Sequence, residues 1–143
     1  MEAHDNVDIA DTDLLIRRID AVEHIVPDGR GGKRVSSEAF KPSSRPPYGL
    51  SIDVKRLIES AGIEPVIFVT TPKFRGSVEF AASIPRSVDL MVGLDPLPEN
   101  KFHGEIWGKV RPDRFTGSQE RALQNGASWL VAIPGVQPRQ YNP

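Results

Sequence analysis

Proline and glycine interrupt this chain so often that only short helices and strands can form between them. The sequence has 13 Pro and 12 Gly in 143 residues. Proline cannot donate to a sheet ladder and breaks helices, while glycine favours turns and helix ends. The apolar runs that remain are far shorter than the roughly 20 residues of a membrane span. A chain of this length suits one domain, so we expect a single α+β domain.

Five apolar runs predict the strands of a mixed or antiparallel sheet. Branched and aromatic side chains favour strands in such runs, and a continuous run is typical of a buried central strand. The run 66–71 is continuous and predicts that central strand. A proline-rich turn joins two other runs into a hairpin. The predicted strands are residues 14–19, 66–71, 88–94, 102–110 and 128–133.

Three other segments predict helices. Residues 54–61 carry apolar side chains at helical spacing, with Ser51 or Asp53 as the N-cap. Residues 118–125 form a further helix that ends near a glycine. Residues 77–83 also favour a helix, although their apolar residues alternate as they would in a strand.

The predicted organisation is one globular body between two tails. Residues 1–13 are expected to be an acidic flexible tail, and residues 134–143 an irregular C-terminal tail. The domain between them, residues 14–133, has about five strands and two or three helices. Its predicted core consists of Leu15, Ile16, Leu57, Ile58, Val66, Phe68, Leu90, Ile106, Leu130 and Val131.

Charge and cysteine content exclude several classes of protein. The net charge of -1 supplies no field that attracts nucleic acid or anionic lipid. The absence of cysteine excludes disulfides and thiolate chemistry and favours a cytoplasmic location. We therefore expect no membrane association and no nucleic-acid partner.

Two adjacent arginines stand in the first apolar run. Strand alternation places Arg17 on the face of Leu15 and Ile19, and Arg18 on the opposite face. Each side chain can lie along apolar neighbours with its charge in solvent. Alternatively, one of them points into a cleft and holds a carboxylate or phosphate with two hydrogen bonds.

A glycine-rich basic segment follows at residues 27–49. Its cations outnumber its carboxylates, and glycine lets backbone N–H groups approach an anion, so Arg34, Ser36 and Ser37 are candidate ligand-binding residues. The spacing matches neither a P-loop nor a dinucleotide fingerprint. The alternative is a mobile, solvated surface loop.

His103 follows a proline-rich turn and has carboxylates within possible reach. Glu105 shares its face of the predicted strand, and Asp95 lies in the preceding turn. His103 and Glu105 are therefore candidate catalytic residues for proton transfer, unless His103 only stabilises the turn. His4 and His24 fit no metal-ligand spacing with it, so no metal site is predicted.

Two segments could contact another protein. Aromatic and proline-rich segments often anchor interfaces, which makes Trp107 and the stretch from Pro42 to Tyr48 candidates. Trp107 and Trp129 could equally be core residues, because both lie in predicted strands.

Four sequence blocks resemble an uncharacterised group of small bacterial proteins. The blocks are Leu15–Ile19, Arg34–Phe40, Leu50–Asp53 and Asp95–Asn100, the last followed by His103. This resemblance brings no activity with it.

A looser resemblance is to ADP-ribosyltransferases, in which an Arg lies on an early strand, a Ser on a second strand and a Glu on a third. It implies that Arg17 or Arg18 holds the phosphates of NAD, that Ser36 or Ser37 orients the cofactor, and that Glu105 supports the reacting ribose. In this chain the serine block reads Ser-Ser-Glu and the glutamate block reads His-Gly-Glu.

Two functions are therefore expected. The first is a non-catalytic binding or accessory subunit of a bacterial multi-protein system, since the chain is small and has no complete catalytic motif. The second is a small enzyme acting on a nucleotide or other phosphorylated ligand, similar to an ADP-ribosyltransferase. The residues themselves identify no cofactor, and the expected partners are another protein or a small anionic ligand.

Overall fold

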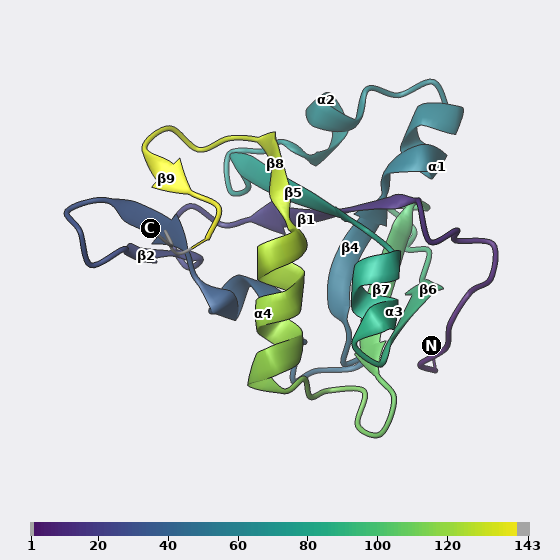
Figure 1. The fold of residues 1–143 in the computed structure, drawn as a ribbon. Coiled ribbons are helices and arrows are strands. Elements are labelled where there is room, and N and C mark those ends of the chain that lie inside the picture. Colours follow the sequence, from purple (N-terminus) through teal and green to yellow (C-terminus); the bar gives the residue numbers. More distant parts are fainter. Residues whose placement is uncertain (1, 140–143) are drawn as a thin grey trace.

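Residues 2–139 are described by the computed structural model, and they form an α+β body with two sheets (Figure 1). Six strands build an antiparallel sheet in the order β6-β7-β4-β1-β5-β8. This confirms the predicted α+β class with an antiparallel sheet. The strands are β1 Leu14–Ile19, β4 Leu50–Val54, β5 Gly76–Ala81, β6 Leu90–Leu94, β7 His103–Gly108 and β8 Ser128–Val131.

A second sheet and five short helices complete the described part of the chain. The sheet has the order β2-β3-β9, with β2 Ile25–Pro27, β3 Lys33–Val35 and β9 Val136–Gln137. The longest helix has ten residues, so no helix within residues 2–139 can cross a bilayer. The helices are the 3₁₀ helix η1 Ser37–Phe40 and the α-helices α1 Lys55–Ser60, α2 Pro65–Val69, α3 Ser83–Ser87 and α4 Gly117–Gly126.

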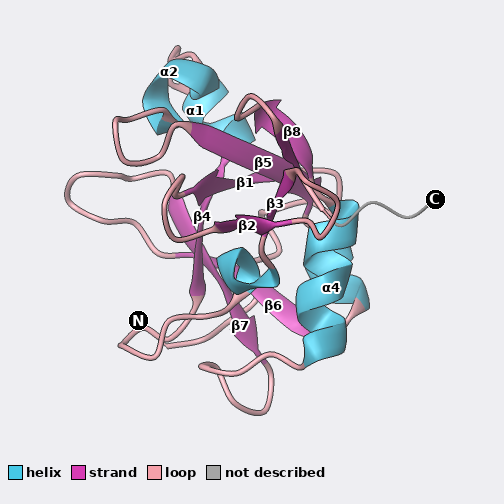
Figure 2. Ribbon diagram, turned by 90° about the vertical axis from the view of Figure 1, so that its left-hand side faces the viewer, coloured by secondary structure: helices cyan, strands magenta, loops and turns pink. Residues whose placement is uncertain are grey.

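Strand β1 separates two apolar clusters, as its alternation predicts. Leu15 and Ile19 belong to the larger cluster, which packs under α3 and α4. Ile16 belongs to the smaller cluster, together with Ile58 of α1 and Val69 of α2. Figure 2 shows β1 and β5 running between the α1–α2 pair and α4. Side chains on the two faces of β1 therefore pack into two different apolar clusters.

The main sheet opens between β1 and β4. β1 pairs with β5 along its whole length, but it pairs with β4 only at Leu15↔Val54 and Ile16↔Asp53. Beyond Ile16 the two strands diverge, while β4 continues to pair with β7 through Leu50↔Ile106. Arg17 and Arg18 therefore lie where the sheet splits.

The central strand predicted at residues 66–71 is wrong, because this run forms helix α2. Pro65 occupies the first turn of the helix, where its fixed φ favours helix and its missing N–H costs nothing. Ile67 is 75% exposed, so the run is not buried on two faces. The β-branched composition is overridden by the tertiary position of the segment.

Two further local assignments differ from the structure. Residues 77–83 were expected to favour a helix, but β5 covers most of them, and Val78 and Phe80 point into the core. Their alternating pattern was the correct signal. Ser51 and Asp53 do not cap a helix, because they lie within β4, and Val54 is the N-cap of α1 without a side-chain bond.

The other predicted elements agree with the structure. The hairpin is formed by β6 and β7, and the helix predicted at residues 118–125 is α4, which begins with a capping box of Thr116 and Gln119. Of the predicted core, Val66 is 36% exposed, while Leu57, Phe68, Leu130 and Val131 are partly buried. Fully buried as predicted are Leu15, Ile16, Ile58, Leu90 and Ile106.

The acidic segment at the N-terminus packs on the domain, although a flexible tail was expected. The Asn6 N–H donates to the Val92 carbonyl at 2.8 Å, and Ile9 is buried in the larger cluster. The Asp13 carboxylate binds Arg56, and Asp5 binds Arg86. Acidic residues here neutralise cations of α1 and α3. At the other end, the expected irregular tail contains β9, and residues 140–143 lie outside the described part.

Candidate functional site

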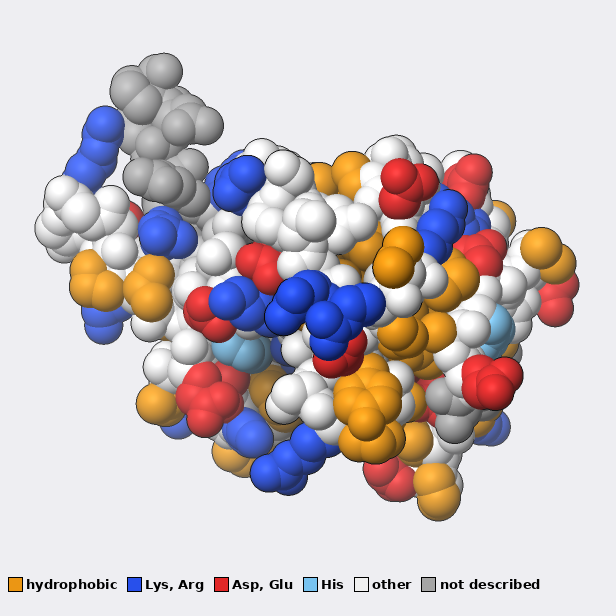
Figure 3. All heavy atoms as spheres, turned by 90° about the horizontal axis from the view of Figure 1, so that it is seen from below, with side chains coloured by type: hydrophobic (Ala, Val, Ile, Leu, Met, Phe, Trp, Pro, Cys, Tyr) orange, Lys and Arg blue, Asp and Glu red, His pale blue; other side chains and the backbone are white. Residues whose placement is uncertain are grey.

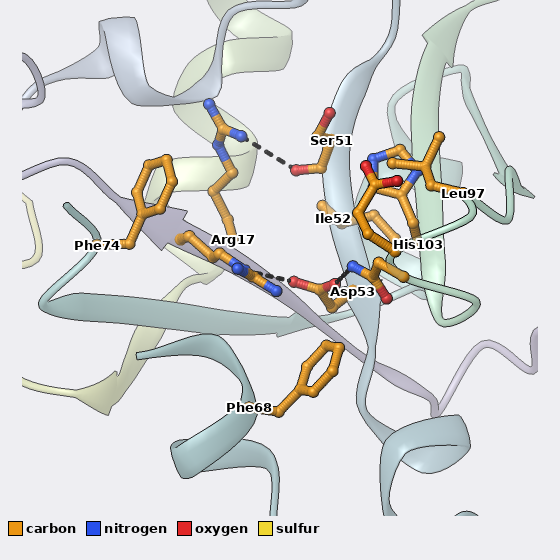
Figure 4. Close-up of a pocket in the computed structure, with 11 residues that line it drawn as sticks. Arg17, Ser51, Ile52, Asp53, Phe68, Phe74, Leu97 and His103 are labelled. Atoms are coloured by element: carbon orange, nitrogen blue, oxygen red, sulfur yellow. Dashed lines mark hydrogen bonds and ion pairs between the residues drawn. The ribbon is translucent and has the colours of Figure 1, made fainter. Parts of the chain in front are cut away.

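The split between β1 and β4 holds a cleft of about 420 Å³ (Figure 4). This volume lies in the range of roughly 300–1,000 Å³ that small-molecule sites occupy. Phe68 of α2 and Phe74 of the following loop form apolar parts of the wall, and residues of the β6–β7 turn form another part. The lining residues are Arg17, Arg18, Ser51, Ile52, Asp53, Phe68, Phe74, Leu97, Glu99, Asn100 and His103.

Arg17 bridges the two diverging strands. Its Nε donates to the Ala39 carbonyl of η1 at 2.8 Å, and one Nη donates to the Ser51 carbonyl of β4 at 3.1 Å. The Ser51 contact is drawn as a dashed line in Figure 4. Burial lowers the pKa of Arg17 to about 10, and the charges of Glu105 and Asp53 oppose this shift. Arg17 thus remains a cation at neutral pH.

Arg18 lines the same cleft, although it stands on the opposite face of β1. Its Nε donates to the Asp53 carboxylate at 3.0 Å, and its guanidinium lies 5.5 Å from the ring centroid of Phe68. The second oxygen of Asp53 accepts from Asn100 Nδ2 at 2.6 Å. Both arginines reach the cleft because it opens at the edge of β1. The charge of Arg18 is already balanced by Asp53.

His103 stands at the cleft between two buried carboxylates. Its Nδ1 lies 2.8 Å from the Asp95 backbone carbonyl, which can only accept, so Nδ1 carries a hydrogen. Its Nε2 faces Glu105 Oε1 at 3.4 Å, and Asp95 Oδ2 lies 3.8 Å from Nδ1. The predicted juxtaposition of Asp95, His103 and Glu105 is therefore present in the fold.

Glu105 is buried behind His103 and does not line the cleft among the described residues. Ser51 Oγ donates to its Oε1 at 3.3 Å, while Oε2 has no hydrogen-bond partner within residues 2–139. Burial raises the pKa of Glu105, as does the charge of Asp95, against the opposing effects of His103, Ser51 and Arg17.

The other predicted ligand-binding residues lie elsewhere. Arg34, Ser36 and Ser37 are not among the described residues that line the cleft. Ser36 Oγ caps η1 by accepting the Glu38 N–H at 3.1 Å, and an Arg34 Nη donates to the adjacent Val35 carbonyl at 3.2 Å. Segment 36–40 still contributes to the site, because the Ala39 carbonyl orients Arg17.

In the glycine-rich turn, the backbone N–H groups that were expected to bind an anion bind a side chain of the turn itself. The Asp28 carboxylate accepts the N–H groups of Arg30 and Gly32 at 2.7 and 2.9 Å. Gly29 and Gly31 have positive φ, which glycine adopts without strain. A carboxylate of the chain itself thus occupies the position of the expected phosphate.

Of the residues that line the cleft, sequence reasoning proposed only Arg17, Arg18 and His103 as site residues and missed the other eight. Ser51 and Asn100 lie in the blocks that suggested the resemblance to small bacterial proteins, but neither was proposed as a site residue. Phe68 was assigned to the core, and Phe74 carried no signal at all. Trp107 is fully buried, and its Nε1 donates to the Pro47 carbonyl at 2.8 Å, so it is a core residue and cannot anchor a partner.

One face of the molecule carries side chains of both charges. Figure 3 shows one face on which Lys and Arg side chains gather among Asp and Glu side chains. This agrees with the net charge of -1.

Comparison of the chain with protein-family models, with curated proteins and with solved structures found no match. The site must therefore be interpreted from its own geometry.

Replacing Gly49 by alanine is expected to destabilise the site. A Cβ at this position would lie 2.5 Å from Glu105 Oε2, 2.7 Å from Glu105 Cβ and 2.9 Å from Trp107 Nε1. These neighbours are buried, so overpacking should cost about 1–3 kcal/mol in the free energy of unfolding, measured by urea denaturation. Gly117→Ala is the control, because the nearest atom there is the flexible end of Arg121. Equal stability of the two variants would contradict the described packing.

The His24 side chain is expected to make stability depend on pH. Its Nδ1 accepts the Asp20 N–H at 2.9 Å. Burial first, and then the charges of Arg17 and Lys73, lower its pKa to about 4, against the opposing charge of Asp20. The unfolded chain, with a histidine pKa near 6.5, therefore binds the proton more readily between pH 6.5 and 4.

Stability should consequently be complete above about pH 6.5 and fall as the pH drops towards about 4. Because His24 is only partly buried, the loss should be about 1–2 kcal/mol after solvent screening. Urea denaturation at pH 7 and pH 4.5 should show a smaller loss for His24→Asn than for the wild type. The same loss in both proteins would exclude His24 as the cause.

Proposed function

We propose that this protein is a small enzyme that acts on a nucleotide or another phosphorylated ligand bound in the cleft. One observation carries the proposal: Arg17 and His103, far apart in the sequence, line one cleft together with Phe68 and Phe74. Small-molecule sites combine an apolar wall with a few convergent polar groups in this way.

Arg17 is the group suited to an anion. Its charge is held at the cleft by two backbone carbonyls, which orient the guanidinium without neutralising it. A guanidinium has five N–H donors, and these two bonds use two of them. Charge-assisted hydrogen bonds to phosphate are stronger than neutral ones. Arg18 contributes less net charge, because Asp53 pairs with it.

The aromatic residues suit the remainder of a nucleotide. Phe68 and Phe74 come from α2 and from the loop before β5, and both border the cleft. Aromatic side chains bind nucleobases by stacking. The resemblance to ADP-ribosyltransferases adds NAD as a candidate ligand. In that family the glutamate acts at the ribose, whereas Glu105 here lies behind His103. NAD is therefore tested as one ligand among several.

The proposal is tested by calorimetric titration at low salt with ADP, ribose 5-phosphate, NAD and adenosine. We expect the phosphorylated ligands to bind and adenosine to bind more weakly. Arg17→Lys keeps the charge but loses the forked geometry, so affinity should fall by about tenfold or more, equivalent to roughly 1.4 kcal/mol. Arg34→Lys, the same change at a residue that does not line the cleft, is the matched control and should bind like the wild type. No binding of any phosphorylated ligand at millimolar concentration would refute the proposal.

The second candidate function is a binding or accessory subunit of a bacterial multi-protein system. It is favoured by the exposed stretch from Pro42 to Tyr48, in which Tyr48 is 39% exposed with a φ of 69°. Sedimentation of the chain with the products of neighbouring genes would reveal a complex. Tyr48→Asn, which tolerates this φ, should weaken it if this stretch is the contact.

A further inference from the structure

We infer that Asp95, His103 and Glu105 form a site for a divalent transition-metal cation at the edge of the cleft. One ligand atom from each residue lies within 4.8 Å of the others, and all three residues are buried. One imidazole and two carboxylates are a donor set that binds Zn²⁺ and similar ions. This set leaves a coordination position for water or a ligand.

The hydrogen bonding of His103 prepares Nε2 as a metal ligand. Nδ1 donates to the Asp95 carbonyl at 2.8 Å, so the lone pair of the neutral ring is on Nε2. Nε2 faces Glu105 Oε1 at 3.4 Å, whereas the Asp95 carboxylate is nearest to Nδ1, with Oδ2 at 3.8 Å, so Asp95 joins the site by turning its side chain towards Nε2. Two ligand atoms that each lie about 2.1 Å from a tetrahedral Zn²⁺ are roughly 3.4 Å apart, so a cation fits between them.

The surroundings resemble the outer shell of a metal site. Metal-ligating histidines usually donate their second N–H to a carbonyl or carboxylate, and ligating carboxylates accept further hydrogen bonds. His103 does the first with Asp95, and Glu105 does the second with Ser51 Oγ at 3.3 Å.

The β6–β7 hairpin holds the three side chains in place. His103 and Glu105 lie two residues apart in β7, and the Asp95 N–H donates to the His103 carbonyl at 2.9 Å. All three ligands therefore stand on one hydrogen-bonded element, as a precise site requires.

An unpartnered oxygen supplies the second observation. Glu105 is only 2% exposed, and its Oε2 has no hydrogen-bond partner among the described residues. An unpaired buried carboxylate oxygen is costly. Arg17 directs its described hydrogen bonds to the Ala39 and Ser51 carbonyls, and not to this carboxylate. A cation bound by both carboxylate oxygens of Glu105, Oε1 and Oε2, would remove this cost.

The site also deepens the proposed function. His103 lines the cleft, so a cation on its Nε2 would lie close to a ligand held by Arg17. Divalent cations bind phosphate oxygens and neutralise their charge. Only this contact with the ligand rests on the proposed function, because cation binding can be measured with no nucleotide present.

The test is calorimetric titration of the full chain with Zn²⁺ and with Mn²⁺, together with the visible absorption of bound Co²⁺. We expect one cation per chain. Glu105→Gln, which keeps the side-chain shape, and Asp95→Asn should each weaken binding, Glu105→Gln by about 100-fold, while Ser51→Ala should weaken it by about tenfold. Asp89→Asn is the control, because the Asp89 side chain is 87% exposed.

Circular dichroism shows whether each variant is folded, and Asp95→Asn and Ser51→Ala decide the matter if Glu105→Gln does not fold. The inference is overturned if the wild type binds none of the three cations at submillimolar concentration, or if the site variants bind like Asp89→Asn. Cation binding without binding of any of the phosphorylated ligands would leave this site standing and refute the proposed function. Binding of a phosphorylated ligand without cation binding would leave the proposed function standing and overturn the cation site.

Discussion

Replacing Arg17 by methionine is expected to lower the free energy of unfolding by about 2–4 kcal/mol and to abolish nucleotide binding in the cleft. The substitution leaves the Ala39 and Ser51 carbonyls without their donor, and it removes the cation that favours ionised Glu105. Urea denaturation measures the first effect, and calorimetric titration with ADP measures the second.

The matched control is Arg45→Met, which makes the same chemical change in an exposed segment. A surface substitution of this kind should alter stability by no more than about 0.5 kcal/mol. Arg17→Lys should lie between the wild type and Arg17→Met in stability, because it keeps a cation. Equal stability of Arg17→Met and Arg45→Met would mean that Arg17 does not hold the split strands together.

Replacing Phe40 by alanine is expected to cost about 3–5 kcal/mol of stability, the usual range for a buried phenylalanine. Phe40 is fully buried in the larger cluster, and its ring centroid lies 6.5 Å from that of Phe80. It ends η1, the element whose Ala39 carbonyl orients Arg17, so binding in the cleft should weaken as well. Urea denaturation and ADP titration would measure both effects.

Phe74→Ala provides the contrast, because Phe74 borders the cleft and is only partly buried. Phe74→Ala should lower the free energy of unfolding by less than Phe40→Ala does. It should lower the affinity for ADP by at least as much as Phe40→Ala does. If Phe40→Ala were the milder of the two in urea, η1 would not be anchored by the core as described.

Elements with a strong local signal were predictable from the sequence. The alternation of Leu14–Ile19 was sufficient to assign β1 and its two faces, since the side-chain period of a strand is two. The hairpin of β6 and β7 was predicted from the turn residues between the two runs, and the helix α4 from the glycine at its end.

Elements whose identity depends on their surroundings were not predictable in this way. The run 66–71 has the composition of a buried strand, yet Pro65 starts a helix there and the run packs by one side only. The acidic N-terminal segment is polar enough for a tail, but its carboxylates meet Arg56 and Arg86 from distant parts of the chain. The composition of a segment does not indicate which distant residues will contact it in the folded protein.

By itself the sequence determined the cluster of Asp95, His103 and Glu105, because strand alternation puts His103 and Glu105 on one face and Asp95 lies in the turn of the same hairpin. Only the tertiary structure decided that this cluster borders a cleft. The cleft exists because β1 leaves β4 after Ile16 while β4 stays with β7. Such pairings join residues far apart in the chain, and no local pattern of side chains encodes where two strands separate.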